Sequence, residues 1–150
     1  MSMLSYRQIY LLIMLVMLSS QPVSATPTTS KPPINPEALT RSYYQAFNDR
    51  NFMRIDELLA EQFEWASVAN GERRVEIKGK DALFTWLTNY FEACPSCRSE
   101  ILSLETTGLR VLIHERMHWQ NSSGDWQQAE AKAEYEFSDT GQLQAATYME

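Results

Sequence analysis

The sequence has few residues of the types that most often form recognisable catalytic or metal sites. Of its 150 residues, two are cysteines and two are histidines. His114 and His118 are four residues apart in one predicted strand, so at about 3.3 Å per residue they stand roughly 13 Å apart and cannot share one ion. The sequence also shows no glycine-rich phosphate loop and no clear Ser-His-Asp spacing. We therefore expect neither a metal nor a cofactor.

A basic surface is also missing from the sequence. The chain has 13 Lys and Arg residues against 19 Asp and Glu residues, a net charge of -6. Nucleic acids and anionic membranes are bound by clustered positive charge, and the sequence has no such cluster. The composition argues against both as main partners.

The N-terminus has no apolar run long enough to span a membrane with ease. Its run covers residues 9–18, about half of the ~20 residues that a spanning helix needs. Arg7 precedes the run, and small residues surround Ala25, which is the layout of a cleaved secretory signal. A permanent anchor is the less favoured alternative. We expect a signal peptide over 1–25, a flexible Pro-, Ser- and Thr-rich linker over 26–34, and a periplasmic or secreted domain over 35–150.

The first half of this domain shows three helical segments and one hairpin. Asn35 precedes proline at the start of a helix that runs to about Asn48, and Asn51 is a predicted cap for a shorter helix extending to Leu59. Two alternating segments flank Asn70-Gly71, a dipeptide that favours a type I′ hairpin turn. A third helix begins after Gly79 and ends at the cysteines.

The second half reads as four strands joined by hairpin-type connections. These strands are "SEILSLE", "LRVLIHERMHW", "AEAKAEYEF" and "LQAATYM". Their order predicts an antiparallel meander, and the fold class is α+β with helices packed on one face of a curved sheet.

Strand alternation separates two faces of this sheet. Glu115 falls on the apolar face with Ile113 and Met117, whereas Arg116 lies on the opposite, charged face. Two interpretations of Glu115 are open. It is a carboxylate at a sheet edge that reaches water or an arginine, or it is a pocket carboxylate with a raised pKa.

Four segments together resemble the SnoaL-like branch of the nuclear transport factor 2-like superfamily. They are "YYQAFNDRNFMRIDELLAEQFEW", "IKGKDALFTWL", "RVLIHERMHW" and "YEFSDTGQLQAATYM". The resemblance covers nearly all of the expected mature domain. It implies a cone-shaped domain whose curved, mostly antiparallel sheet wraps around the N-terminal helices and a pocket, often as a homodimer. It implies no particular reaction.

Ketosteroid isomerases of this superfamily use an aspartate base, a tyrosine and a protonated aspartic acid. By resemblance, Tyr43 falls at the tyrosine position, Ser67 at the base and Ala133 at the second acid. Serine cannot abstract such a proton unaided, and alanine has no side-chain donor. Ketosteroid isomerase activity is not expected, and the resemblance carries over Tyr43 alone.

The pair Cys94 and Cys97 has two interpretations. In thioredoxin-like enzymes a C-x-x-C motif begins a helix, but here Cys94 follows a helix and Cys97 leads into a strand. Arg98 would favour a thiolate, so disulfide exchange stays an alternative. An oxidising compartment favours a local disulfide that stiffens the corner.

Three functions follow as hypotheses. The first is binding of a small, largely apolar molecule, without required catalysis, in a cavity lined by Tyr43, Trp65, Ser67, Glu115, Ala133 and Tyr135. The second is a cofactor-free isomerase, cyclase or hydro-lyase in which Glu115 is the acid or base and Tyr43 or Tyr135 polarises a carbonyl. The third is a protein-interaction domain that uses the charged outer sheet face.

Overall fold

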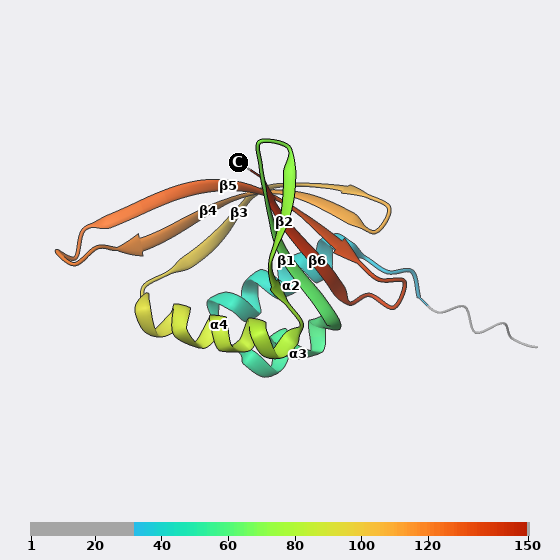
Figure 1. Cartoon of the computed structure of the whole chain (residues 1–150), viewed down its shortest axis with the longest axis horizontal. Coiled ribbons are helices and arrows are strands. Elements are labelled where there is room, and N and C mark those ends of the chain that lie inside the picture. The colour runs from blue at the N-terminus through green and yellow to red at the C-terminus, as the bar shows by residue number, and fades with distance from the viewer. Residues whose placement is uncertain (1–31, 150) are drawn as a thin grey trace, which may run out of the picture. The chain divides into compact units, whose positions relative to one another are not determined.

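The computed structural model describes residues 32–149. The expected signal peptide and most of the expected linker lie outside these residues. The elements are α2 (Pro36–Asn48), α3 (Phe52–Leu58), β1 (Leu59–Ala69), β2 (Glu72–Lys78), α4 (Lys80–Ala93), β3 (Arg98–Thr107), β4 (Arg110–Gln120), β5 (Trp126–Phe137) and β6 (Leu143–Met149) (Figure 1). None of the helices in this part of the chain has the length and hydrophobicity needed to cross a membrane.

The helix starts follow the predicted capping residues. The side-chain oxygen of Asn35 accepts a hydrogen bond from the amide of Ala38 at 3.0 Å, and that of Asn51 accepts one from Arg54 at 3.0 Å. The second helix is shorter than predicted. Leu59 has extended backbone, with φ -95° and ψ 143°, and is fully buried. It begins β1 because extended backbone lets it pair with Leu143 of β6.

The six strands form one sheet in the order β2-β1-β6-β5-β4-β3. The predicted meander of β3 to β6 is confirmed, because each neighbouring pair is antiparallel. Asn70 and Gly71 both have positive φ, 53° and 79°, as the predicted type I′ turn requires. The parallel pairing of β1 with β6 was not predicted; it joins the N-terminal hairpin to the meander.

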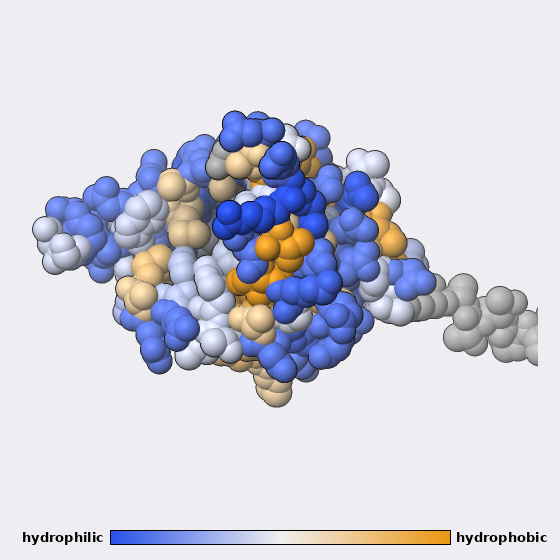
Figure 2. Space-filling model, in the orientation of Figure 1, coloured by the Kyte–Doolittle hydropathy of each residue, from blue (hydrophilic) through white to orange (hydrophobic). Residues whose placement is uncertain are grey.

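The helices lie on one side of the curved sheet, as Figure 1 shows, and the hydrophobic core lies between the two layers. Phe63, Ile113 and Phe137 contribute to it from the strands, and Leu83 and Leu87 from α4. The viewed surface is mostly hydrophilic, with a compact hydrophobic cluster where β1 and β2 run (Figure 2). The expected α+β architecture with a mostly antiparallel sheet is confirmed.

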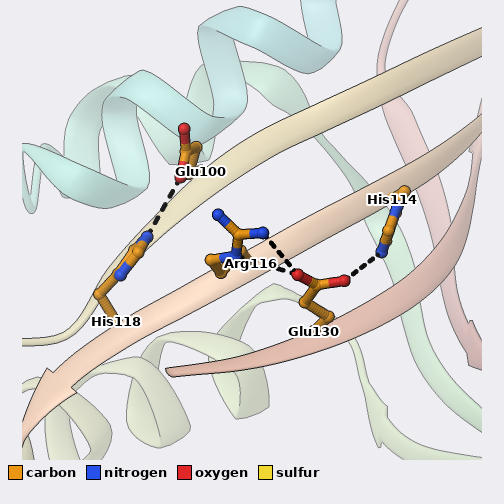
Figure 3. A network of polar contacts seen from close by, with 5 residues as sticks. All are labelled: Glu100, His114, Arg116, His118 and Glu130. Atoms are coloured by element: carbon orange, nitrogen blue, oxygen red, sulfur yellow. Dashed lines mark hydrogen bonds and ion pairs between the residues drawn. The ribbon is translucent and has the colours of Figure 1, made fainter. Parts of the chain in front are cut away.

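The opposite sheet face carries the charged residues that alternation assigned to it. Glu130 of β5 pairs with His114 at 2.9 Å and with Arg116 at 2.6 Å, both on β4. His118 pairs with Glu100 of β3 at 3.1 Å (Figure 3). Each histidine therefore lies at the surface beside a different carboxylate.

The corner between α4 and β3 contains the predicted disulfide. Cys94 and Cys97 are bonded, with their Cα atoms 5.4 Å apart. The Ser96 hydroxyl between them accepts a hydrogen bond from the amide of Gln120 at 2.9 Å. The disulfide thus closes the short loop, and the Ser96 hydrogen bond attaches the loop to the end of β4.

Candidate functional site

A cavity of about 90 Å³ lies between α2, α4 and the inner face of the sheet. Most of its lining is aromatic, and Glu115 is the one charged side chain among the described residues that line it. One carboxylate is too few ligands for a structural metal site. The lining residues are Tyr43, Tyr44, Phe47, Phe63, Trp65, Leu83, Trp86, Leu87, Tyr90, Ser99, Glu115, Met117, Tyr135, Ala146 and Tyr148.

Glu115 is buried in this lining, with 3% of its surface exposed. The Tyr44 hydroxyl of α2 donates to its Oε2 atom at 2.5 Å. Tyr148 of β6 also hydrogen-bonds to the carboxylate. No described Lys, Arg or His side chain forms an ion pair with it. Tyrosines from α2 and β6 thus converge on one buried acid of β4.

Burial raises the pKa of Glu115 above its ordinary value, against the opposing effect of the hydrogen bonds from Tyr44 and Tyr148. Burial also raises the pKa of Tyr43, with the Glu115 charge as a smaller cause. The pKa of Tyr148 is raised by the same two causes in the same order. The tyrosines are therefore neutral donors over the physiological range, while Glu115 is the group whose proton can be exchanged.

Three half-buried rings form an outer wall of the cavity. Trp65 of β1 meets Trp86 of α4 edge to face, with ring centroids 4.3 Å apart. Trp86 in turn stacks on Tyr90, with centroids 4.9 Å apart and planes 13° from parallel. The Tyr90 hydroxyl donates to the sulfur of Met117 at 3.0 Å. The inner tyrosines are buried, so the half-exposed Trp65, Trp86 and Tyr90 mark the side of the cavity nearest to solvent.

The structure brings together four of the six residues proposed from the sequence: Tyr43, Trp65, Glu115 and Tyr135 all line the cavity. Glu115 has tyrosine partners, and no described arginine pairs with it.

Ser67 and Ala133 are not among the residues that line the cavity. Ser67 lies nearer the hairpin turn, where its hydroxyl donates to Glu76 of β2 at 2.8 Å. Ala133 is fully buried beside Ile113 and Tyr148 in the sheet, and its methyl group is covered.

The sequence reasoning missed Tyr44, Tyr148, Trp86 and Tyr90 as cavity residues. Tyr44 follows Tyr43 directly on a helix, so their side chains differ by about 100° in direction. The apolar periodicity marks one face of the helix and therefore includes Tyr43 but not Tyr44. Tyr148 enters the site because β6 lies between β1 and β5. That strand order depends on the parallel pairing, which has no local sequence signal. Trp86 and Tyr90 fit the apolar periodicity of α4, but periodicity alone does not distinguish a core position from a cavity wall.

The sequence profile of a family described as "SnoaL-like domain" matches residues 40–145. This match covers most of the chain, so the protein belongs to the SnoaL-like family. Its fold is that of a solved nuclear transport factor 2-like protein. No curated protein sequence matched the chain.

Solved structures with the same fold share few identical residues with this chain. TerC, crystallised with polyporic acid, is 14% identical with a TM-score of 0.62, over 75% of this chain and 88% of TerC. A protein from Jannaschia sp. CCS1, provisionally named a SnoaL-like polyketide cyclase, is 14% identical with a TM-score of 0.63, over 75% and 83%. One from Kribbella flavida DSM 17836, provisionally named a ketosteroid isomerase, is 21% identical with a TM-score of 0.61, over 76% of each chain. These similarities show the fold.

Proposed function

We propose that this domain binds a small, largely apolar molecule in the cavity, with Glu115 and Tyr44 as its polar anchors. The observation that carries the proposal is a buried carboxylate, hydrogen-bonded to Tyr44, in a mostly aromatic cavity. Ligand sites commonly combine apolar walls with a few convergent polar groups. The polyporic acid complex of TerC is a further argument for small-molecule binding in this fold.

The size of the cavity limits the ligand. At about 90 Å³ it is smaller than the ~300–1,000 Å³ of common ligand pockets. It is also smaller than the engineered cavity of ~150 Å³ that accepts benzene. A ligand therefore places a small group beside Glu115, and a larger body requires movement of the half-exposed wall at Trp65 and Trp86.

Binding is tested by native mass spectrometry of the domain purified without denaturation, followed by NMR titration with acetone and 2-propanol, which are smaller than benzene. Ala146→Leu is the matched variant, because Ala146 lines the cavity and is 4% exposed. We expect the wild type to bind a probe and the folded Ala146→Leu variant to lose most of that affinity. Equal binding by both proteins would locate the ligand elsewhere and contradict the proposal. Circular dichroism checks that the variant is folded.

The second candidate function is a cofactor-free isomerase, cyclase or hydro-lyase that uses Glu115 as acid or base. The raised pKa of this carboxyl favours it, because acid-base groups work best with pKa values near the operating pH. Tyr44 is placed to hold the carboxyl in one orientation, whereas Tyr43 and Tyr135 are the candidate donors to a substrate oxygen. With a turned-over substrate in hand, Glu115→Gln should lower kcat about 10²-fold or more and leave binding nearly intact. A protein that only binds its ligand would show no turnover even as the wild type.

We further propose that the mature chain is exported and forms a homodimer. The N-terminal signal pattern supports export, and the family resemblance supports the dimer. The charged outer face of the sheet, with Arg116, Lys132 and Glu134, is the alternative surface for a protein partner. Charge reversal at Arg116 should disrupt such a complex and leave probe binding in the cavity unchanged. Analytical ultracentrifugation measures the oligomeric state.

A further inference from the structure

Among residues 32–149, no positively charged side chain pairs with the carboxylate of Glu115. It is 3% exposed, and its hydrogen-bond partners are the neutral hydroxyls of Tyr44 and Tyr148. A buried charge without a counter-ion costs several kcal/mol in general, and proteins normally pair such a charge or neutralise it. In the described part of the chain, no Lys, Arg or His fulfils that role. A ligand could supply the missing charge.

The walls of the cavity also favour positive charge. Aromatic rings carry a negative potential on their faces and attract cations there. Trp65, Trp86, Tyr90 and Tyr148 all line the cavity together with Glu115. No described cationic side chain lines it, so an anionic ligand would meet only repulsive or neutral groups. The carboxylate attracts a cation, and so does the face of an aromatic ring.

We infer that the ligand of this cavity carries a small organic cation, such as an alkylated ammonium group, which binds between Glu115 and the aromatic rings. The inference rests on the proposed binding function and specifies its ligand class. A methylated ammonium head has the low polarity that aromatic walls accept. It is about as large as benzene, so it enters a cavity of about 90 Å³ only with movement of the half-exposed wall. An apolar body attached to this head would extend toward the half-exposed wall.

The test compares two probes of similar size and different charge, tetramethylammonium and tert-butanol, by NMR titration of the full folded domain. The indole signals of Trp65 and Trp86 report on the cavity. We expect tetramethylammonium to bind about tenfold more tightly than tert-butanol, or more, as a desolvated cation–π site with a carboxylate would produce.

Two variants assign the preference to named groups. Glu115→Gln should weaken tetramethylammonium at least ~10-fold and change tert-butanol by no more than ~2-fold, because only the cation gains from the charge. Trp86→Leu should also weaken the cation more than the alcohol. Trp126→Leu is the matched control, because Trp126 is 62% exposed on β5 and does not line the cavity. It should leave both affinities unchanged.

The affinity for tetramethylammonium should also rise with pH as Glu115 loses its proton. The other titratable groups that face this carboxyl are neutral tyrosines from α2, α4, β5 and β6, and burial raises the pKa of each: Tyr43, Tyr44, Tyr90, Tyr135 and Tyr148. Glu115→Gln should therefore flatten the profile.

Two results would overturn the inference while leaving the cavity-binding proposal intact. In the first, tert-butanol binds as tightly as tetramethylammonium. In the second, Glu115→Gln leaves the affinity for tetramethylammonium unchanged. If neither probe shifts the cavity signals, the cation inference is also wrong, and the comparison of wild type with Ala146→Leu then decides separately whether the cavity binds neutral ligands.

Discussion

At the scale of single residues, Glu115 couples the possible function of the domain to its stability. Its carboxyl is buried and has no cationic partner in the part of the chain that the structure describes, and burial raises its pKa in the folded state. In the unfolded chain the same group has an ordinary pKa of about 4.3. The folded state therefore binds the proton more tightly. The stabilisation that comes from protonation of Glu115 is fully present below the unfolded-state pKa. It is lost as pH rises through the folded-state pKa.

Replacement of Glu115 by Gln should remove this pH dependence. The amide stays neutral, so Tm for Glu115→Gln relative to wild type should increase between pH 4 and pH 8, roughly the range in which a buried carboxyl ionises. Thermal unfolding followed by circular dichroism measures it, with Glu105→Gln at an exposed position of β3 as the control. A difference in Tm between variant and wild type that stays constant across this pH range would show that burial does not raise the pKa of Glu115.

At the scale of elements, Arg50 joins the helical hairpin to the disulfide corner. It lies between α2 and α3, and its guanidinium donates to the carbonyl oxygens of Asn48, Pro95 and Cys97, each at 3.0 Å. The same group lies 4.4 Å from the ring centroid of Phe91 on α4. One planar side chain thereby satisfies acceptors from two segments that are distant in the sequence.

Arg50→Asn should lower the free energy of unfolding by about 1–3 kcal/mol, because three hydrogen bonds to backbone carbonyls and the cation–π contact disappear. Asparagine tolerates the positive φ of 53° at this position, so the change tests the side chain rather than the backbone. Urea unfolding measures the loss. Arg54→Ala is the matched control: its ion pair with Glu57 is exposed, so its loss should cost about 0–1 kcal/mol. Equal losses would mean that the Arg50 contacts do not stabilise the corner.

At the scale of the whole molecule, the sequence predicted local elements better than their assembly. Caps, the Asn70-Gly71 turn and strand alternation act between near neighbours, so Asn35, Asn51 and the face of Glu115 were all assigned correctly. The parallel pairing of β1 with β6 depends on residues about 80 positions apart, and no local pattern encodes it.

The candidate site was predictable to the extent that it follows from alternation within a strand. Glu115 and Tyr135 lie on the inner face for this reason. The Tyr44 partner and the rings of α4 belong to other elements, and their convergence depends on how the helices pack against the sheet. For the same reason no pattern within α4 marks Trp86 as part of a cavity wall.

Export and oxidation should leave a joint signature on the complete chain. If the signal is cleaved after Ala25, the intact mass of protein from the exported fraction corresponds to a chain that begins at Thr26. With the disulfide formed, that mass is two hydrogens below the reduced form.

The Cys94→Ser, Cys97→Ser double variant should lose about 2 kcal/mol of unfolding free energy, the chain-entropy value for a loop this short. Because reduction opens the same loop, reductant should destabilise the wild type by a similar amount and the double variant not at all. An uncleaved N-terminus would contradict export, and free thiols before reduction would contradict a structural disulfide.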